Sequence, residues 1–181
     1  MVPEELENKL MEWQETGEYP EIDLDKFVDF YSAYPLFTLA PCIIKNSKKI
    51  AIDKIYGSNW AFQNKQNRGN YPCSNKLNSL FYEYTKRNKK PMYRRQIPPV
   101  PIVKIFDKYF LDEGNHRLYI CKLLNRKFIL ADVAEYNYKY FLDHSCLDFF
   151  RNIPYIIYEN KMYHIDDDSK INYLKLKTKH P

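Results

Sequence analysis

The sequence predicts an α+β domain in which helices pack on a small mixed sheet. Hydrophobic residues make up 45% of the 181-residue chain and aromatic residues 17%, enough to fill one core of reasonable size. Short stretches in which polar and apolar residues alternate, as in strands, are separated by stretches with apolar residues at helical spacing. Because strands and helices follow one another along the chain, we expect a layered arrangement around one core.

Residues 48–136 are expected to form the central domain. Its predicted strands lie at residues 49–55, 98–105, 109–111 and 128–134. A polar loop at 57–73 and a helix at 74–90 separate the first two strands, and a turn at 106–108 joins the next two. A helix at 115–124 precedes the last strand, and its wide apolar face implies burial against the sheet.

Segments on either side of this domain are expected to add to it. Residues 1–40 form an acidic segment with predicted helices at 3–13 and about 24–32. Residues 137–181 follow the domain and are expected to pack on the same core. They contain most of an aromatic stretch at 136–150, predicted to be helical in part, a hairpin built from 155–158 and 162–165, and a basic tail.

Charge is distributed unevenly along the chain. Residues 1–30 hold ten acids and two bases, a charge of −8, whereas the remaining 151 residues carry +13. A body this basic attracts anions, so a nucleotide, DNA or an acidic protein partner is expected. The acidic segment either folds back against the body or has a regulatory or DNA-mimicking role.

Several classes of protein are not expected. No apolar run approaches the roughly 20 residues that a membrane-spanning helix needs, and no secretory signal follows Met1. The four cysteines have no metal-like spacing, so we expect reduced structural thiols and a cytoplasmic location; they are Cys42, Cys73, Cys121 and Cys146.

The stretch from Asp112 to Arg117 is the strongest candidate for a functional site. Gly114 permits a backbone conformation that other residues resist, and Asn115 can cap the helix that follows. The first N–H groups of that helix, at the positive end of its dipole, form an anion site. Arg117 offers a planar fork of donors for phosphate oxygens, and His116 can donate a hydrogen bond or a proton.

The two acids before the glycine suit a catalytic or a metal-binding role. Asp112 or Glu113 could hold Mg²⁺ or accept a proton from an acceptor hydroxyl. A purely structural interpretation also stays open, in which Asn115 caps the helix, Arg117 pairs with Glu113 and His116 fills space.

The order of these elements resembles the ParB/sulfiredoxin-like fold, whose members share a Gly-x-His-Arg motif. The residues that carry the resemblance are 50–58, 101–105, the turn at Asp107-Lys108, 109–117 and 123–133, with the motif itself at 114–117. The resemblance covers residues 48–136, about half of the chain. It implies a nucleotide-phosphate site for ATP or CTP with Mg²⁺, in which Gly114, Asn115, His116 and Arg117 hold the phosphates.

Members of this fold family differ in activity, so the fold alone does not choose one. Sulfiredoxins carry a cysteine directly before the His-Arg pair, where this chain has Asn115, so sulfiredoxin chemistry is not expected. Partitioning ParB proteins need a helix-turn-helix region after this domain, and the remaining 137–181 segment is not predicted to form one. The free-serine kinases place an acid directly before the glycine, the position of Glu113 here.

Other candidates lie outside the motif. Asp53, near the end of the first predicted strand, is a candidate second acid, and Arg68 is expected to reach a triphosphate because its loop lies beside the site in the resembled fold. A basic run could follow a nucleic-acid backbone or could be a solvated helix end; its cations are Lys86, Arg87, Lys89, Lys90, Arg94 and Arg95. The acidic triplet at 166–168 is expected to be a solvated turn rather than a cation site.

Two functions from different classes follow. The first is a protein that hydrolyses ATP or CTP, or transfers its phosphate, with catalytic roles for Asp53, Asp112, Glu113 and His116. The second is a non-catalytic module that binds DNA or a protein partner, and a ParB-like nuclease of a mobile element lies between the two. The identity of the nucleotide, the phosphate acceptor and the oligomeric state stay open.

Overall fold

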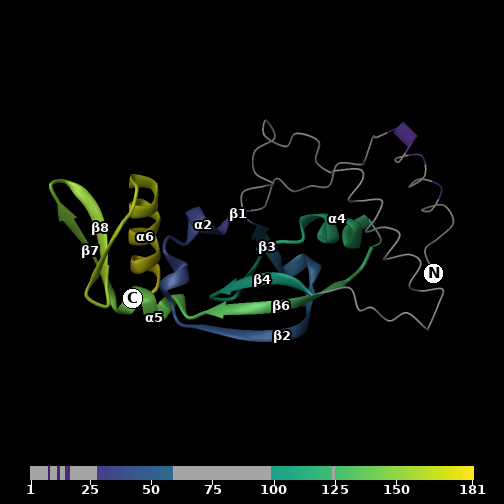
Figure 1. The fold of residues 1–181 in the computed structure, drawn as a ribbon, viewed down its shortest axis with the longest axis horizontal. Coiled ribbons are helices and arrows are strands. Elements are labelled where there is room, and N and C mark those ends of the chain that lie inside the picture. Colours follow the sequence, from purple (N-terminus) through teal and green to yellow (C-terminus); the bar gives the residue numbers. More distant parts are fainter. Residues whose placement is uncertain (1–7, 9–11, 13–14, 17–27, 59–98, 124) are drawn as a thin grey trace.

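The computed structural model describes residues 8, 12, 15–16, 28–58, 99–123 and 125–181. These residues form an α+β fold with two sheets (Figure 1), which confirms the predicted class. The larger sheet has six strands in the order β1-β3-β5-β4-β6-β2, and the smaller has the order β7-β8-β9. The predicted helices at 3–13 and 74–90 lie wholly or mostly outside the described residues, although residues 8 and 12 have helical backbone.

The strands of the larger sheet are β1 (Val28–Asp29), β2 (Cys42–Ala51), β3 (Ile55–Ser58), β4 (Val100–Ile105), β5 (Lys108–Leu111) and β6 (Phe128–Tyr136). Those of the smaller sheet are β7 (Ser145–Phe150), β8 (Ile153–Tyr158) and β9 (Lys161–His164). The helices are α2 (Phe30–Ala33), α4 (Asn115–Leu123), α5 (Tyr138–Asp143) and α6 (Asp167–Lys179), with 3-10 turns η1 (Phe37–Leu39) and η2 (Ile52–Lys54). The larger sheet is mixed, because β3 runs parallel to both β1 and β5, β4 runs parallel to β6, and the other two neighbouring pairs are antiparallel.

Strand β4 is buried on both faces of the sheet. Its alternating side chains divide between two cores: Val103 and Ile105 join an aromatic core on one face, and Val100 and Ile102 join an aliphatic core on the other. A strand with core on both sides reads as a nearly continuous apolar run, which is the pattern of residues 100–105.

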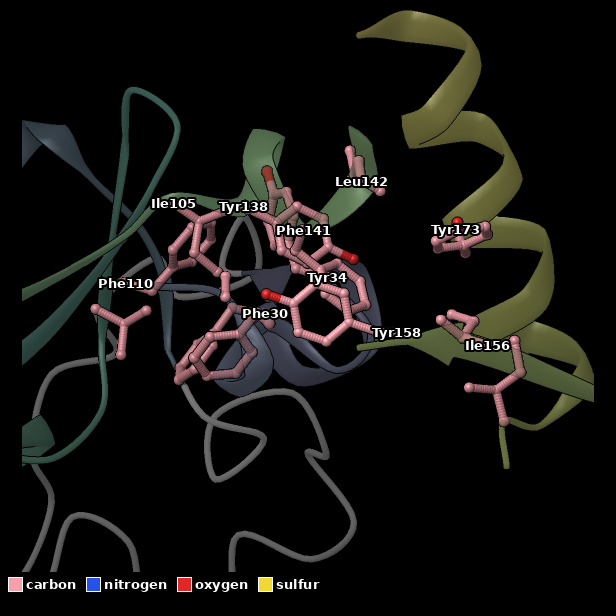
Figure 2. Packing of buried hydrophobic residues seen from close by; sticks show 14 residues of the cluster. Phe30, Tyr34, Ile105, Phe110, Tyr138, Phe141, Leu142, Ile156, Tyr158 and Tyr173 are labelled. Carbon is pink, nitrogen blue, oxygen red and sulfur yellow. The ribbon is translucent and has the colours of Figure 1, made fainter. Parts of the chain in front are cut away.

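The aromatic core joins segments that are far apart in the sequence (Figure 2). Phe30 of α2 packs 5.4 Å, between ring centroids, from Phe110 of β5, and Tyr138 of α5 stacks on Phe141. The buried Tyr138 hydroxyl donates a 2.7 Å hydrogen bond to the carbonyl of Pro35. Residues 30–40 and 137–181 therefore share one core with the larger sheet.

The aliphatic core lies beneath α4. Leu118 and Cys121 are buried against Leu111, Ala131 and other apolar side chains of the sheet, which confirms the predicted helix and its buried face. The helix ends where Asn125 adopts a left-handed conformation with φ of 49°, and the next N–H, that of residue 126, donates back to Cys121.

The single strand predicted at 49–55 is wrong. Residues 42–51 form β2, which is an edge strand of the sheet and pairs with β6. The turn η2 then leads into β3, which is separated from β2 in the sheet by β6, β4 and β5. Ile50, Ile52 and Ile55 are all buried in the aliphatic core, so the buried face continues from β2 through η2 into β3. Burial on one face, rather than one continuous strand, explains the pattern.

Two other predictions are corrected near the ends of the chain. Residues 28–29 form β1, so the described part of the helix predicted at about 24–32 is only α2. The acidic triplet at 166–168 begins α6 instead of forming a turn, because the Asp166 side chain accepts a 2.7 Å hydrogen bond from the N–H of Ser169. The aromatic stretch is helical in part, as α5, and the hairpin β8–β9 is confirmed.

The described part of the chain contains no helix long and apolar enough to cross a membrane. The described cysteines are all free thiols: Cys121 is buried, whereas Cys42 and Cys146 are exposed.

Candidate functional site

Gly114 forms a tight turn between β5 and α4. Its φ is +93°, in the left-handed region, and a Cβ added to it would lie 2.7 Å from Cγ1 of Val100 at the start of β4. Both the backbone conformation and the close approach require a residue without a side chain. The prediction that this glycine serves a special backbone conformation is confirmed.

The N-terminal end of α4 opens directly after this turn. The N–H of Leu118 donates to the carbonyl of Gly114 at 3.0 Å, so Gly114 occupies the N-cap position and Asn115 is the first helical residue rather than the cap. The N–H groups of residues 115–117 have no acceptor within the helix. The side chains of Asn115 and His116 lie outside what the structure describes.

Arg117 is half-buried one turn into α4. Its Nη1 donates a 3.4 Å hydrogen bond to the carbonyl of Pro99, the residue before β4. Pro99 directly precedes Val100, the residue whose side chain lies against Gly114. The guanidinium is therefore held at the same end of the sheet as the start of α4.

Asp112 follows β5 and is half-buried. Its N–H donates to the carbonyl of Pro101 at 3.1 Å, and its side chain is hydrogen-bonded to that of Tyr31 in α2. Burial, and then the charge of Glu113, raise the pKa of Asp112, whereas the bond to Tyr31 lowers it. A carboxylate with a raised pKa is a better proton acceptor near neutral pH.

Glu113 is exposed beside Asp112, directly before the glycine. Among the described side chains of this turn, the two carboxylates are the ones suited to a metal ion, and the described part of the chain has no group of three or more His, Cys, Asp or Glu side chains that could hold one. Mg²⁺ usually takes one or two protein carboxylates and completes its shell with water and substrate phosphates. The pair therefore fits Mg²⁺ that arrives with a nucleotide better than a resident metal.

The structure does not bring Asp53 to this site. Asp53 lies in η2, two residues before Ile55, and Ile55 is level with Tyr109 in the parallel β3–β5 pair, whereas Asp112 follows the other end of β5. At about 3.3 Å per residue, the strand pair separates the two acids by roughly 10 Å or more. Arg68 and the predicted nucleic-acid run at Lys86, Arg87, Lys89, Lys90, Arg94 and Arg95 lie outside the described residues.

Three residues at this site were not anticipated from the sequence. They are Tyr31, which bonds Asp112, Pro99, which accepts from Arg117, and Val100, which closes on Gly114. Only the tertiary fold brings Tyr31 to a residue 81 positions away in the sequence, and no local pattern signals such a contact.

Comparison of the chain with protein-family models, with curated proteins and with solved structures finds no match.

Proposed function

We propose that this protein binds a nucleotide through the start of α4 and, with Mg²⁺, hydrolyses ATP or CTP or transfers its phosphate. The observation that carries the proposal is the Gly114 turn, in which a glycine-specific backbone conformation directly precedes the first N–H groups of a nine-residue helix. Such groups bind phosphate oxygens. A side chain at position 114 would collide with Val100 and displace the start of the helix that presents them.

Arg117 adds a positive charge one turn into the same helix. It donates to the carbonyl of Pro99 beside the start of β4, and the planar fork of its guanidinium suits phosphate oxygens. The order of β3, the β4–β5 hairpin, the Gly114 turn, α4 and β6 is also compatible with the ParB/sulfiredoxin-like resemblance.

The two carboxylates before the turn make Mg²⁺ part of the proposal. Asp112 and Glu113 would repel a bare phosphate, and a divalent cation held between them and the phosphate removes that repulsion. If Glu113, the exposed member of the pair, is the one that ligates the cation, the half-buried environment of Asp112 suits it to accept a proton from water or from an acceptor hydroxyl. His116 is the proposed proton donor, and Asp53 has no part in this site.

Nucleotide binding is the direct test. Labelled ATP and CTP are titrated against the full chain with and without Mg²⁺, and release of inorganic phosphate is followed in parallel. We expect binding that requires Mg²⁺ and that Arg117→Ala weakens about tenfold or more, because charge-assisted hydrogen bonds are lost. Asp112→Asn with Glu113→Gln should remove the dependence on Mg²⁺.

Arg151→Ala is the matched control, because Arg151 is an exposed arginine in the turn between β7 and β8, away from α4. It should bind the nucleotide as the unaltered protein does. Since Arg117 also bonds Pro99, urea unfolding must show that Arg117→Ala is folded under the assay conditions. Absence of binding by the unaltered protein, or unchanged binding by folded Arg117→Ala, would contradict the proposal.

A further inference from the structure

The end of β2, η2 and the start of β6 come together at the end of the larger sheet farthest from α5 and α6 (Figure 1). Strand β2 ends and β6 begins there, with Ala51 opposite Phe128 and Lys49 opposite Leu130. The N–H of Ile52 donates to the carbonyl of residue 127 at 3.1 Å, which ties η2 to the turn between α4 and β6. The exposed cations gathered by this pairing are Lys49, Lys54, Arg126 and Lys127.

These four cations have no ion-pair partner within the described residues. Other lysines of the larger sheet are paired: Lys104 of β4 lies 2.7 Å from Glu135 of β6, and Lys45 of β2 pairs with the same carboxylate. The acid nearest to the four cations along the described chain is Asp53 in η2. Cations left unpaired together are available to an external anion.

An exposed aromatic ring lies among these charges. Phe128 is 56% exposed, although it stands at the start of a strand whose next residue, Ile129, is buried in the aliphatic core. Residues opposite each other in an antiparallel pair share a face, and so do alternate residues of one strand, so Phe128 and Lys49 lie diagonally on the face away from α4. Arg126 and Lys127 directly precede the ring in the chain.

We infer that this surface, defined by Lys49, Lys54, Arg126, Lys127 and Phe128, binds single-stranded nucleic acid. The cations follow the phosphate backbone, and Phe128 is the ring on which one base stacks. A cationic surface with an exposed ring is how proteins hold single strands without sequence preference. The surface is separate from the start of α4, because it lies beyond the C-terminal end of that helix.

The test uses the full chain and fluorescence anisotropy with labelled oligo-dT and oligo-U of about 15 nucleotides, a length near the upper site size of one small domain. Affinity is measured over a range of salt concentrations. We expect Arg126→Glu/Lys127→Glu to weaken binding at least tenfold and to reduce the slope of log K against log salt by about 1.4, at about 0.7 per lost phosphate contact. Phe128→Ala should weaken binding about tenfold.

Matched controls lie on the far side of the molecule. Lys161→Glu/Lys175→Glu makes the same change in net charge at two exposed lysines of β9 and α6, and Phe150→Ala removes an exposed ring from β7. Both should bind as the unaltered protein does. Arg117→Ala should also bind oligonucleotides normally, which separates this inference from the nucleotide site.

Three results would overturn the inference. The first is that the unaltered protein fails to bind oligonucleotides. The second is that Arg126→Glu/Lys127→Glu binds them as tightly as Lys161→Glu/Lys175→Glu does. The third is that Phe128→Ala has no effect on binding and that duplex DNA and heparin bind as well as single strands do. This result would make the surface a general polyanion site. If the patch variants fail to fold, Arg126→Gln/Lys127→Gln is measured in their place, with the same direction expected.

Discussion

Gly114 and Val100 are in such close contact that the turn before α4 and the start of β4 exclude a side chain between them. The distance of 2.7 Å from Val100 Cγ1 to an added Cβ is shorter than any ordinary contact between carbon atoms. Because the turn before α4 packs directly against β4 through this contact, the position of the helix start depends on a glycine.

Gly114→Ala should destabilise the protein by about 2–4 kcal/mol, from backbone strain at positive φ together with the clash. The free energy of unfolding in urea measures this. Part of the cost is specific to Val100, so in a Val100→Ala background the cost of Gly114→Ala should fall by about 0.5–3 kcal/mol. Glu113→Ala, an exposed change next to the glycine, should stay within about 0.5 kcal/mol of the unaltered protein. Equal costs of Gly114→Ala in both backgrounds would refute the contact.

The raised pKa of Asp112 predicts a pH effect on stability. When the pKa of an acid is higher in the folded state, that state binds more protons between the two pKa values, so stability falls as pH rises from the ordinary carboxyl pKa to the raised one. Asp112→Asn should remove this decline and be at least as stable as the unaltered protein at neutral pH. Unfolding in urea at a series of pH values measures it, with Asp53→Asn, an exposed acid, as the control.

The hydrogen bond between Tyr31 and Asp112 predicts a further change in the pKa of Asp112. Tyr31→Phe removes a hydrogen bond that favours the charged carboxylate, so the pKa of Asp112 should rise further. The expected cost in unfolding free energy at neutral pH is about 0.5–1 kcal/mol, because Tyr31 is half-exposed. An NMR titration of the Asp112 carboxyl carbon measures the shift, and an unchanged or lower pKa would contradict it.

Lys177 links α6 to α5 and β7 through hydrogen bonds. Its Nζ donates to the carbonyl of Leu142 at 2.8 Å, to the hydroxyl of Tyr173 at 3.2 Å, and to the carbonyl of Ser145. Lys177→Met keeps the apolar stem but removes these three hydrogen bonds, so we expect a loss of about 1–3 kcal/mol in urea unfolding. Lys175→Met, at an exposed position of the same helix, should change stability by less than about 0.5 kcal/mol. If the two variants are equally stable, Lys177 does not have this role.

The sequence by itself determined the elements whose signal is local. The β4–β5 hairpin, the α4 helix and the β8–β9 hairpin follow from patterns within about ten residues, and the need for a glycine at 114 follows from the helix that starts immediately after it. Helix α6 was missed because its apolar residues do not form one buried face: Tyr173 is buried, whereas Ile171 and Leu174 are exposed. The Asp166 cap and the bonds of Lys177 stabilise it instead.

Only the tertiary structure decided which distant residues meet. It divided the apolar pattern around Ile50 and Ile55 between two strands, moved Asp53 away from Asp112, and placed Tyr31 on that carboxylate. It also brought the end of β2 and η2, each with an exposed lysine, to the start of β6 at Phe128. Local periodicity records which face of a segment is buried, but strand order and register depend on long-range packing, and no short stretch of sequence encodes them.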